Sequence, residues 1–265
     1  MLDQKSLLRN ILNEFFDKFC LSESAETDFY GTYPNTLFSP RDYLDYAEDE
    51  LKQIDNGVDH LINCIGHLKR AIDAQIDIFF NVLGVNTIFQ KRNLKFDKKL
   101  EFLKQMDLVS PSTLSRFNRI RNQIEHEHNL PLDLDMEVFF DLSTAFIISL
   151  ELTIVLLTTS ELTFDIRRYG KRLVLVGDVY EQENEGKDEF EIIEGAFFKI
   201  SHKFPTPEIV VSWNLNSQEQ NLRAKITNVS TESDVAEFAY FLRVFVLLVK
   251  YEGFATSNLY VYDHI

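Results

Sequence analysis

Apolar residues recur at helical spacing through most of the first 160 positions. Between residues 2 and 20 they lie on one face of a helix: Leu7, Leu8, Ile11, Leu12, Phe15, Phe16 and Phe19. Spacing of three and four residues is typical of an amphipathic helix. The same pattern predicts helices over about 42–56, 58–83, 98–106, 112–128 and 135–162, with Gly57, Gly84 and Pro131 as interruptions. The stretch 22–40, rich in Ser, Gly and Pro, predicts a long loop, and 91–93 predicts a linker.

The pattern changes from Asp165 onward. Runs of β-branched and aromatic residues over 172–180, 190–200, 209–215 and 221–229 predict strands that are separated by polar turns. A helix over about 233–251 and a last strand over 258–262 complete the expected elements. The sequence therefore predicts an α+β protein, with an all-α domain over 1–163 and a small α+β domain over 164–265 whose sheet is mostly antiparallel.

Composition narrows the range of functions. The net charge of −15 opposes a broad nucleic-acid-binding surface, because non-specific affinity for phosphate backbones comes mainly from Lys and Arg. The two cysteines and the absence of a secretory signal pattern indicate a cytoplasmic protein. The apolar stretch Ala145 to Leu157 is shorter than the roughly 20 residues of a membrane span and carries Glu151, so a buried core helix is expected and no membrane association.

One segment carries candidate chemistry. Arg121 is followed by Asn122 and, after three more residues, by His126, in a predicted helix that precedes a long apolar helix. This Arg-x4-His pattern resembles the active-site motif of the HEPN family of helical-bundle proteins, which includes many ribonuclease toxins and defence proteins. The stretch from His67 to Asp77 is similar to an early helix of several members. The resemblance covers roughly the first 160 residues.

The resemblance implies a metal-independent endoribonuclease that acts as a homodimer in bacterial defence or stress response, with RNA as its substrate and no cofactor. Two motifs would meet across the dimer. Arg121 would hold the phosphate, His126 would transfer the proton or orient the 2′-hydroxyl, and Asn122 would position both. The chemistry suits these side chains, because Arg engages two phosphate oxygens and His exchanges protons near neutral pH.

Two alternatives stay open at this motif. On a regular helix Arg121 and His126 are about 140° apart, whereas Arg121 and His128 share a face, so His128 is an alternative catalytic residue. Arg121 could instead pair with Glu125 while both histidines are solvated, which leaves a non-catalytic scaffold that binds RNA or a regulatory protein partner. His128 also stands where relatives paired with a nucleotidyltransferase antitoxin carry a modified tyrosine, so such regulation is not expected.

Three other groups of residues give weaker predictions. His60 and His67 are seven residues apart on one helix face, which is more typical of a surface pair than of a metal site. A basic cluster of Lys91, Arg92, Lys95, Lys98 and Lys99 could guide RNA, although a solvated face is the more common role. Asp133 and Asp135 predict a helix N-cap. No metal is expected.

Overall fold

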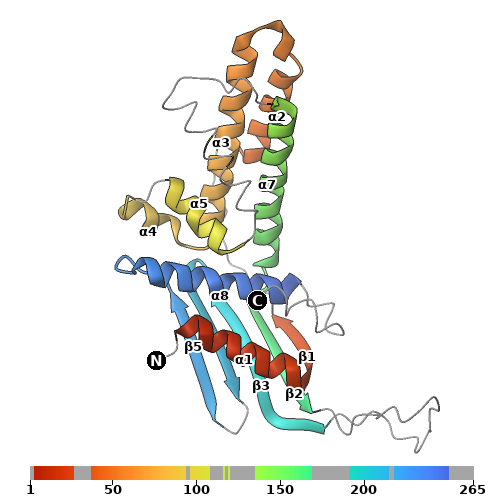
Figure 1. Cartoon of the computed structure of the whole chain (residues 1–265), viewed down its shortest axis with the longest axis vertical. Helices are drawn as coiled ribbons and strands as arrows, with labels where there is room; N and C mark the ends of the chain where they lie inside the picture. The colour runs from red at the N-terminus through yellow and green to blue at the C-terminus, as the bar shows by residue number, and fades with distance from the viewer. Residues whose placement is uncertain are drawn as a thin grey trace, which may run out of the picture.

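The computed structural model describes residues 3–26, 37–93, 96–107, 116, 119, 135–168, 191–214 and 218–250. These residues form two lobes (Figure 1). The helical lobe contains α2 (Pro40–Leu51), the 3-10 turn η1 (Ile54–Asn56), α3 (Val58–Val82), α4 (Asn86–Lys91), α5 (Phe96–Gln105) and α7 (Met136–Leu156). The sheet lobe contains α1 (Gln4–Lys18), β1 (Phe19–Glu26), β2 (Glu161–Arg168), β3 (Glu191–Lys203), β4 (Thr206–Asn214), β5 (Glu219–Lys225) and α8 (Glu232–Lys250).

The helical lobe is built on α3, which packs against both α2 and α7 (Figure 1). Its apolar stripe is buried as the periodicity predicts, including Ile65, Leu68, Ile72, Ile76 and Phe79. Burial of these side chains stabilises the bundle by about 1.5–3 kcal/mol each before entropy is subtracted.

Local capping fixes where two of these helices begin. The hydroxyl of Ser39 accepts a hydrogen bond from the Asp42 amide, while the Asp42 carboxylate accepts one from the Ser39 amide at 2.6 Å. Pro40 at the first helical position needs no intrahelical partner for its nitrogen. Asp135 caps α7 by accepting from the Val138 amide at 3.1 Å, so the predicted N-cap is confirmed at this residue.

The sheet has the order β1-β2-β3-β4-β5, and every neighbouring pair is antiparallel. On β2, β3 and β4 alternate side chains are buried under α8, with α1 beside it on the same face (Figure 1). The buried set includes Leu162, Phe164, Phe198, Ile200, Ile209, Val211 and Trp213. This alternation is the expected pattern for a sheet with one covered face. The predicted α+β class and antiparallel sheet are confirmed.

The two lobes meet through a shared aromatic core. Phe102 of α5 stacks on Phe238 of α8 with ring centroids 6.3 Å apart, and Phe204 of the β3–β4 turn contacts the same ring at 6.2 Å. Behind Phe102 lie Phe80 and Phe89, at centroid distances of 5.4 and 6.0 Å. An ion pair from Asp107 to Arg243, 3.0 Å long, joins the end of α5 to α8.

Several element predictions were wrong, and strand pairing explains those at β1 and β2. Residues 22–26 form part of β1 rather than a loop, because β1 pairs with β2 from Phe19 opposite Arg168 to Glu26 opposite Glu161. Helix α7 ends at Leu156 and β2 begins at Glu161, whereas a helix to residue 162 was expected. Residues 86–91 form α4 where no helix was expected.

The predicted division at residues 163 and 164 also differs from the lobes. Helix α1 and strand β1 lie in the sheet lobe, not in the helical one, because β1 is the edge strand beside β2 and α1 contacts α8. The predicted strands over 172–180 and 258–262 lie outside the described residues.

Helix α7 is long and apolar enough to cross a membrane by length and composition. Core helices of soluble proteins pass the same test, and α7 packs along α3 with Phe139, Phe146, Ile147 and Leu150 buried. Buried Ser143 donates a hydrogen bond to the Phe139 carbonyl within the helix. One face of α7 is therefore buried in the core as predicted, whereas Leu152 and Val155 on another face are exposed.

Candidate functional site

The four predicted catalytic residues, Arg121, Asn122, His126 and His128, lie outside the described residues. Within the predicted motif helix the structure describes Arg116 and Arg119, and both are helical. Arg119 is exposed, whereas Arg116 is partly buried and its Nε has no hydrogen-bond partner. The structure therefore agrees with a helix at these two positions and leaves the geometry of the motif a prediction.

Helices α5 and α7 lie on either side of the motif segment in the chain. Helix α5 ends at Gln105, and Asp107 takes a left-handed φ of 54° that stops further helix. The next described residue after Arg119 is Asp135, which caps α7.

A groove of about 650 Å³ lies where the end of α5, the last turns of α7 and the last turns of α8 come together. Leu152 and Val155 of α7 line it, with exposed fractions of 60% and 59%. Val246 and Leu247 of α8 form the facing wall. Such a concentration of exposed apolar side chains is typical of a surface that another element or chain covers.

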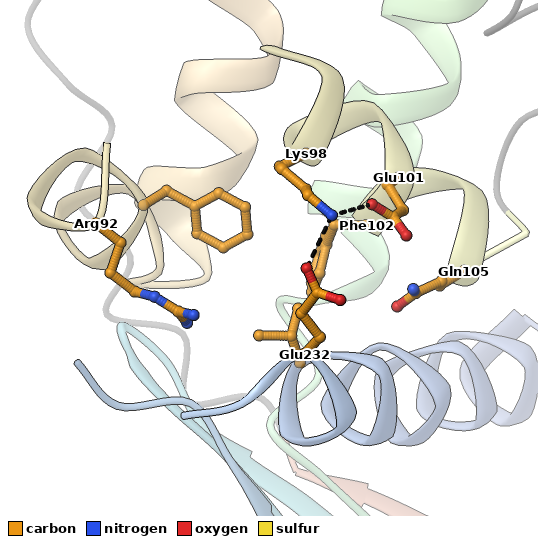
Figure 2. Close-up of a pocket in the computed structure, with 8 residues that line it drawn as sticks. Arg92, Lys98, Glu101, Phe102, Gln105 and Glu232 are labelled. Carbon is orange, nitrogen blue, oxygen red and sulfur yellow. Dashed lines mark hydrogen bonds and ion pairs between the residues drawn. The ribbon is translucent and has the colours of Figure 1, made fainter. Parts of the chain in front are cut away.

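A second, smaller hollow separates α4 and α5 from the start of α8 (Figure 2). Its volume is about 50 Å³, so it has room for a few water molecules rather than a nucleotide. Lys98 donates to Glu101 and Glu232 across it, each at 2.9 Å. This interaction lowers the pKa of Glu232, which keeps that carboxylate charged.

Two polar atoms in this hollow are buried without a hydrogen-bond partner: Nη1 of Arg92 and Oε1 of Gln105. A guanidinium donor and an amide acceptor are the groups that an ordered water can bridge. The two cations, Arg92 and Lys98, are balanced by the two carboxylates, Glu101 and Glu232, so the hollow does not form an anion site.

Two residues of the predicted basic cluster, Lys98 and Lys99, are paired with carboxylates, whereas Lys91 is exposed. Lys98 is paired as described above, and Lys99 forms an ion pair with Asp77 of α3. Arg92 lines the small hollow, and Lys95 lies outside the described residues. Among the residues that can be placed, this arrangement favours a structural role over a path for RNA.

The two histidines of α3 have separate partners. Nδ1 of His60 lies 2.7 Å from Oε2 of Glu50, and Asn63 donates to the same carboxylate at 3.3 Å. His67 lies among aromatic rings of α2, and its pKa is lowered by burial and by nearby Arg70. Within the described part of the chain, no group of three or more His, Cys, Asp or Glu side chains gathers in a geometry that could hold a metal ion.

The aromatic environment of His67 was not anticipated from the sequence. Tyr43 and Tyr46 are three residues apart on α2, and that spacing was the available signal. No protein-family model, no curated protein and no solved structure matches this chain.

Proposed function

We propose that this protein is a metal-independent endoribonuclease of HEPN type that acts as a cytoplasmic homodimer. The observation that carries the proposal is the spacing of Arg121, Asn122 and His126 in a segment that directly precedes a long apolar helix, α7. The helical residues Arg116 and Arg119 support a helix at the start of that segment.

In the proposed reaction, His126 takes the proton from a ribose 2′-hydroxyl. The resulting oxygen attacks the adjacent phosphorus, and the bond to the 5′-oxygen of the next nucleotide breaks. The leaving oxygen takes a proton from water and His126 returns its proton to the solvent, so that the products are a 2′,3′-cyclic phosphate and a 5′-hydroxyl. Arg121 stabilises negative charge on the phosphorane oxygens, and Asn122 orients the reacting groups.

The surface of α7 supports the homodimer. Its exposed apolar residues Val138, Ile148, Leu152 and Val155 fall within about 100° of the helix circumference. Two copies of such a stripe can cover each other in a two-fold arrangement, since the same surface serves both partners. A two-fold axis parallel to α7 would place the two N-terminal ends of α7, which adjoin the motif segments in the chain, on the same side, as a composite site requires.

Cleavage of a labelled single-stranded RNA in the presence of EDTA tests the proposal. Arg121→Ala and His126→Ala should each lower the rate by at least about 100-fold, as expected for loss of charge stabilisation or proton transfer. The matched control is Arg119→Ala, which removes an exposed arginine two positions away and should leave the rate unchanged. An RNA in which the attacked ribose lacks its 2′-hydroxyl should stay intact.

The variant His128→Ala distinguishes the Arg121–His126 spacing from the longer Arg121–His128 spacing. If it abolishes cleavage while His126→Ala does not, the longer spacing is the functional one. Loss of activity on chelation, with recovery on adding a divalent metal, would contradict the mechanism.

A second candidate is a non-catalytic scaffold that binds RNA or a protein partner. The net charge of −15 and the pairing of Lys98 and Lys99 with carboxylates favour a scaffold of this kind that binds a protein partner. A folded dimer that cuts no RNA under any of these conditions would establish the scaffold over the enzyme.

A further inference from the structure

Four rings form a cluster on the outer side of the α2–α3 pair. Phe38, just before α2, lies 5.9 Å from Tyr43 and 6.1 Å from Tyr46, measured between ring centroids. His67 of α3 stacks on Tyr43 at 6.5 Å and contacts Tyr46 at 5.5 Å. The sequence places these rings together because Tyr43 and Tyr46 lie one turn apart on α2, and α2 runs beside α3.

Part of this cluster faces solvent. Phe38 is 41% exposed and Tyr46 is 42% exposed, whereas the rings of the lobe junction, such as Phe80 and Phe102, are fully buried. The cluster also contains a buried Nδ1 atom of His67 that has no hydrogen-bond partner. Core packing therefore does not account for the two outer rings.

The surroundings of these rings are acidic. Helix α2 carries five acidic residues and one basic residue, Arg41. On a helix, Asp42 and Asp49 lie one turn on either side of Tyr46, and Asp45 and Asp49 are themselves neighbours. Arg41 forms a bidentate ion pair with Glu151 of α7, and its charge also interacts with that of Asp45, one turn along α2.

The remaining nearby cations weaken the acidity without reversing it. Lys52 pairs with Glu48 and Asp49 at 3.5 and 3.4 Å through exposed side chains, and Arg70 lies beside His67. Asp42 is tied to Ser39 by the helix cap but keeps its negative charge. Exposed pairs of this kind are worth little and can exchange for a better partner.

We propose that this acidic aromatic face, formed by Phe38, Tyr46, Asp45 and Asp49, binds an arginine- or lysine-rich segment of a protein partner. A guanidinium placed on the face of Tyr46 or Phe38 gains a cation–π interaction, and the adjacent carboxylates accept its hydrogen bonds. RNA would stack on the same rings, but the carboxylates repel its phosphates. The charge of the face therefore favours the basic peptide.

The proposed binding surface uses none of the residues assigned to the ribonuclease reaction. The experiment measures peptide binding rather than RNA cleavage. Failure to bind the peptide therefore says nothing against the ribonuclease, and failure to cleave RNA says nothing against peptide binding.

The probe is a short fluorescein-labelled peptide of alternating arginine and glycine, titrated with the full-length protein at about 150 mM salt and followed by fluorescence anisotropy. Tyr46→Ala removes a ring without changing the net charge and should weaken binding about fivefold, the equivalent of roughly 1 kcal/mol. Tyr46→Phe should retain binding. Tyr46→Leu, which keeps apolar volume at the site, should behave like Tyr46→Ala and guards against a folding defect.

Two substitutions that each remove one negative charge, Asp45→Asn and Glu219→Gln, test whether the position of the charge matters. Asp45→Asn should weaken peptide binding about two- to fivefold, whereas Glu219→Gln, an exposed carboxylate in the sheet lobe, should leave it unchanged. Equal effects of the two substitutions would mean that the peptide responds to net charge alone and would overturn the proposal. Wild-type affinity in Tyr46→Leu would also overturn it, as would an oligouridine that binds this face more tightly than the peptide.

Discussion

Replacing Gly84 with alanine tests how the two lobes are joined. Gly84 follows α3 with a left-handed φ of 73°, and its backbone donates to the Asn81 carbonyl at 3.0 Å. A Cβ at this position would lie directly on the carbonyl oxygen of Pro205 in the β3–β4 turn and 2.5 Å from the carbonyl carbon. The glycine is therefore required both by its conformation and by a close approach of the two lobes.

The expected cost has two parts. A left-handed conformation costs an alanine about 1–2 kcal/mol relative to glycine. Moving the Pro205 turn away from the new methyl group costs a further 1–3 kcal/mol or so, as for overpacking of a well-packed site. The free energy of unfolding should therefore fall by about 2–5 kcal/mol.

Urea denaturation measures this loss with two probes. The single tryptophan, Trp213, is buried in β4 and reports on the sheet lobe by fluorescence, while far-UV circular dichroism reports mainly on the helices. In Gly84→Ala the transitions followed by fluorescence and by circular dichroism should have different midpoints, because the damaged contact between residue 84 and Pro205 links the two lobes.

The control is Gly66, a glycine within α3, at which a Cβ would meet only Arg70 at 3.8 Å. Gly66→Ala should stabilise the protein by about 0.5–1 kcal/mol through helix propensity. If Gly84→Ala unfolds within about 0.5 kcal/mol of the wild type, with coincident transitions, the close approach to Pro205 is not what joins the lobes.

Three further outcomes follow from buried groups and from the α7 surface. Nε2 of His202 donates to the Thr159 carbonyl at 2.8 Å, its Nδ1 accepts from the Phe204 amide at 3.3 Å, and burial lowers its pKa from 6.5 to about 4. Between pH 4 and pH 6.5, His202 is protonated in the unfolded chain and neutral in the folded one. The free energy of unfolding is therefore highest above about pH 6.5 and falls by up to about 3 kcal/mol as the pH drops to 4. His202→Gln should flatten this part of the pH–stability curve, and an unchanged slope would assign the loss to other groups. Burial raises the pKa of the Cys64 thiol to about 11. In a Cys20→Ser variant, Cys64 of the folded protein should therefore react with a disulfide reagent at pH 8 far more slowly than Cys64 of the unfolded chain. Equal rates would show that the thiol is accessible in the folded protein. Leu152→Glu should convert the proposed dimer to a monomer in light scattering, whereas Val229→Glu, at an exposed apolar residue of the sheet lobe, should not; a Leu152→Glu dimer would place the interface elsewhere.

Local patterns in the sequence determined much of the fold. The helical spacing predicted α3 and α8 nearly to the residue, since their buried stripes repeat over many turns and average out local exceptions. Gly84 and Asp135 marked helix boundaries because their backbone and capping properties act within one turn. The composition of the strands likewise identified β3, β4 and β5.

Tertiary structure decided what local pattern could not. Residues 22–26 have the composition of a loop and become a strand only because β2, far along the chain, supplies hydrogen-bond partners. The same long-range pairing draws α1 into the sheet lobe. At the candidate sites, the spacing of Arg121 and His126 in the sequence predicts catalysis. Only the fold pairs Lys98 and Lys99 with distant carboxylates and gathers Phe38, Tyr46 and His67 on one face. These contacts join residues from different elements, and periodicity within one element carries no information about them.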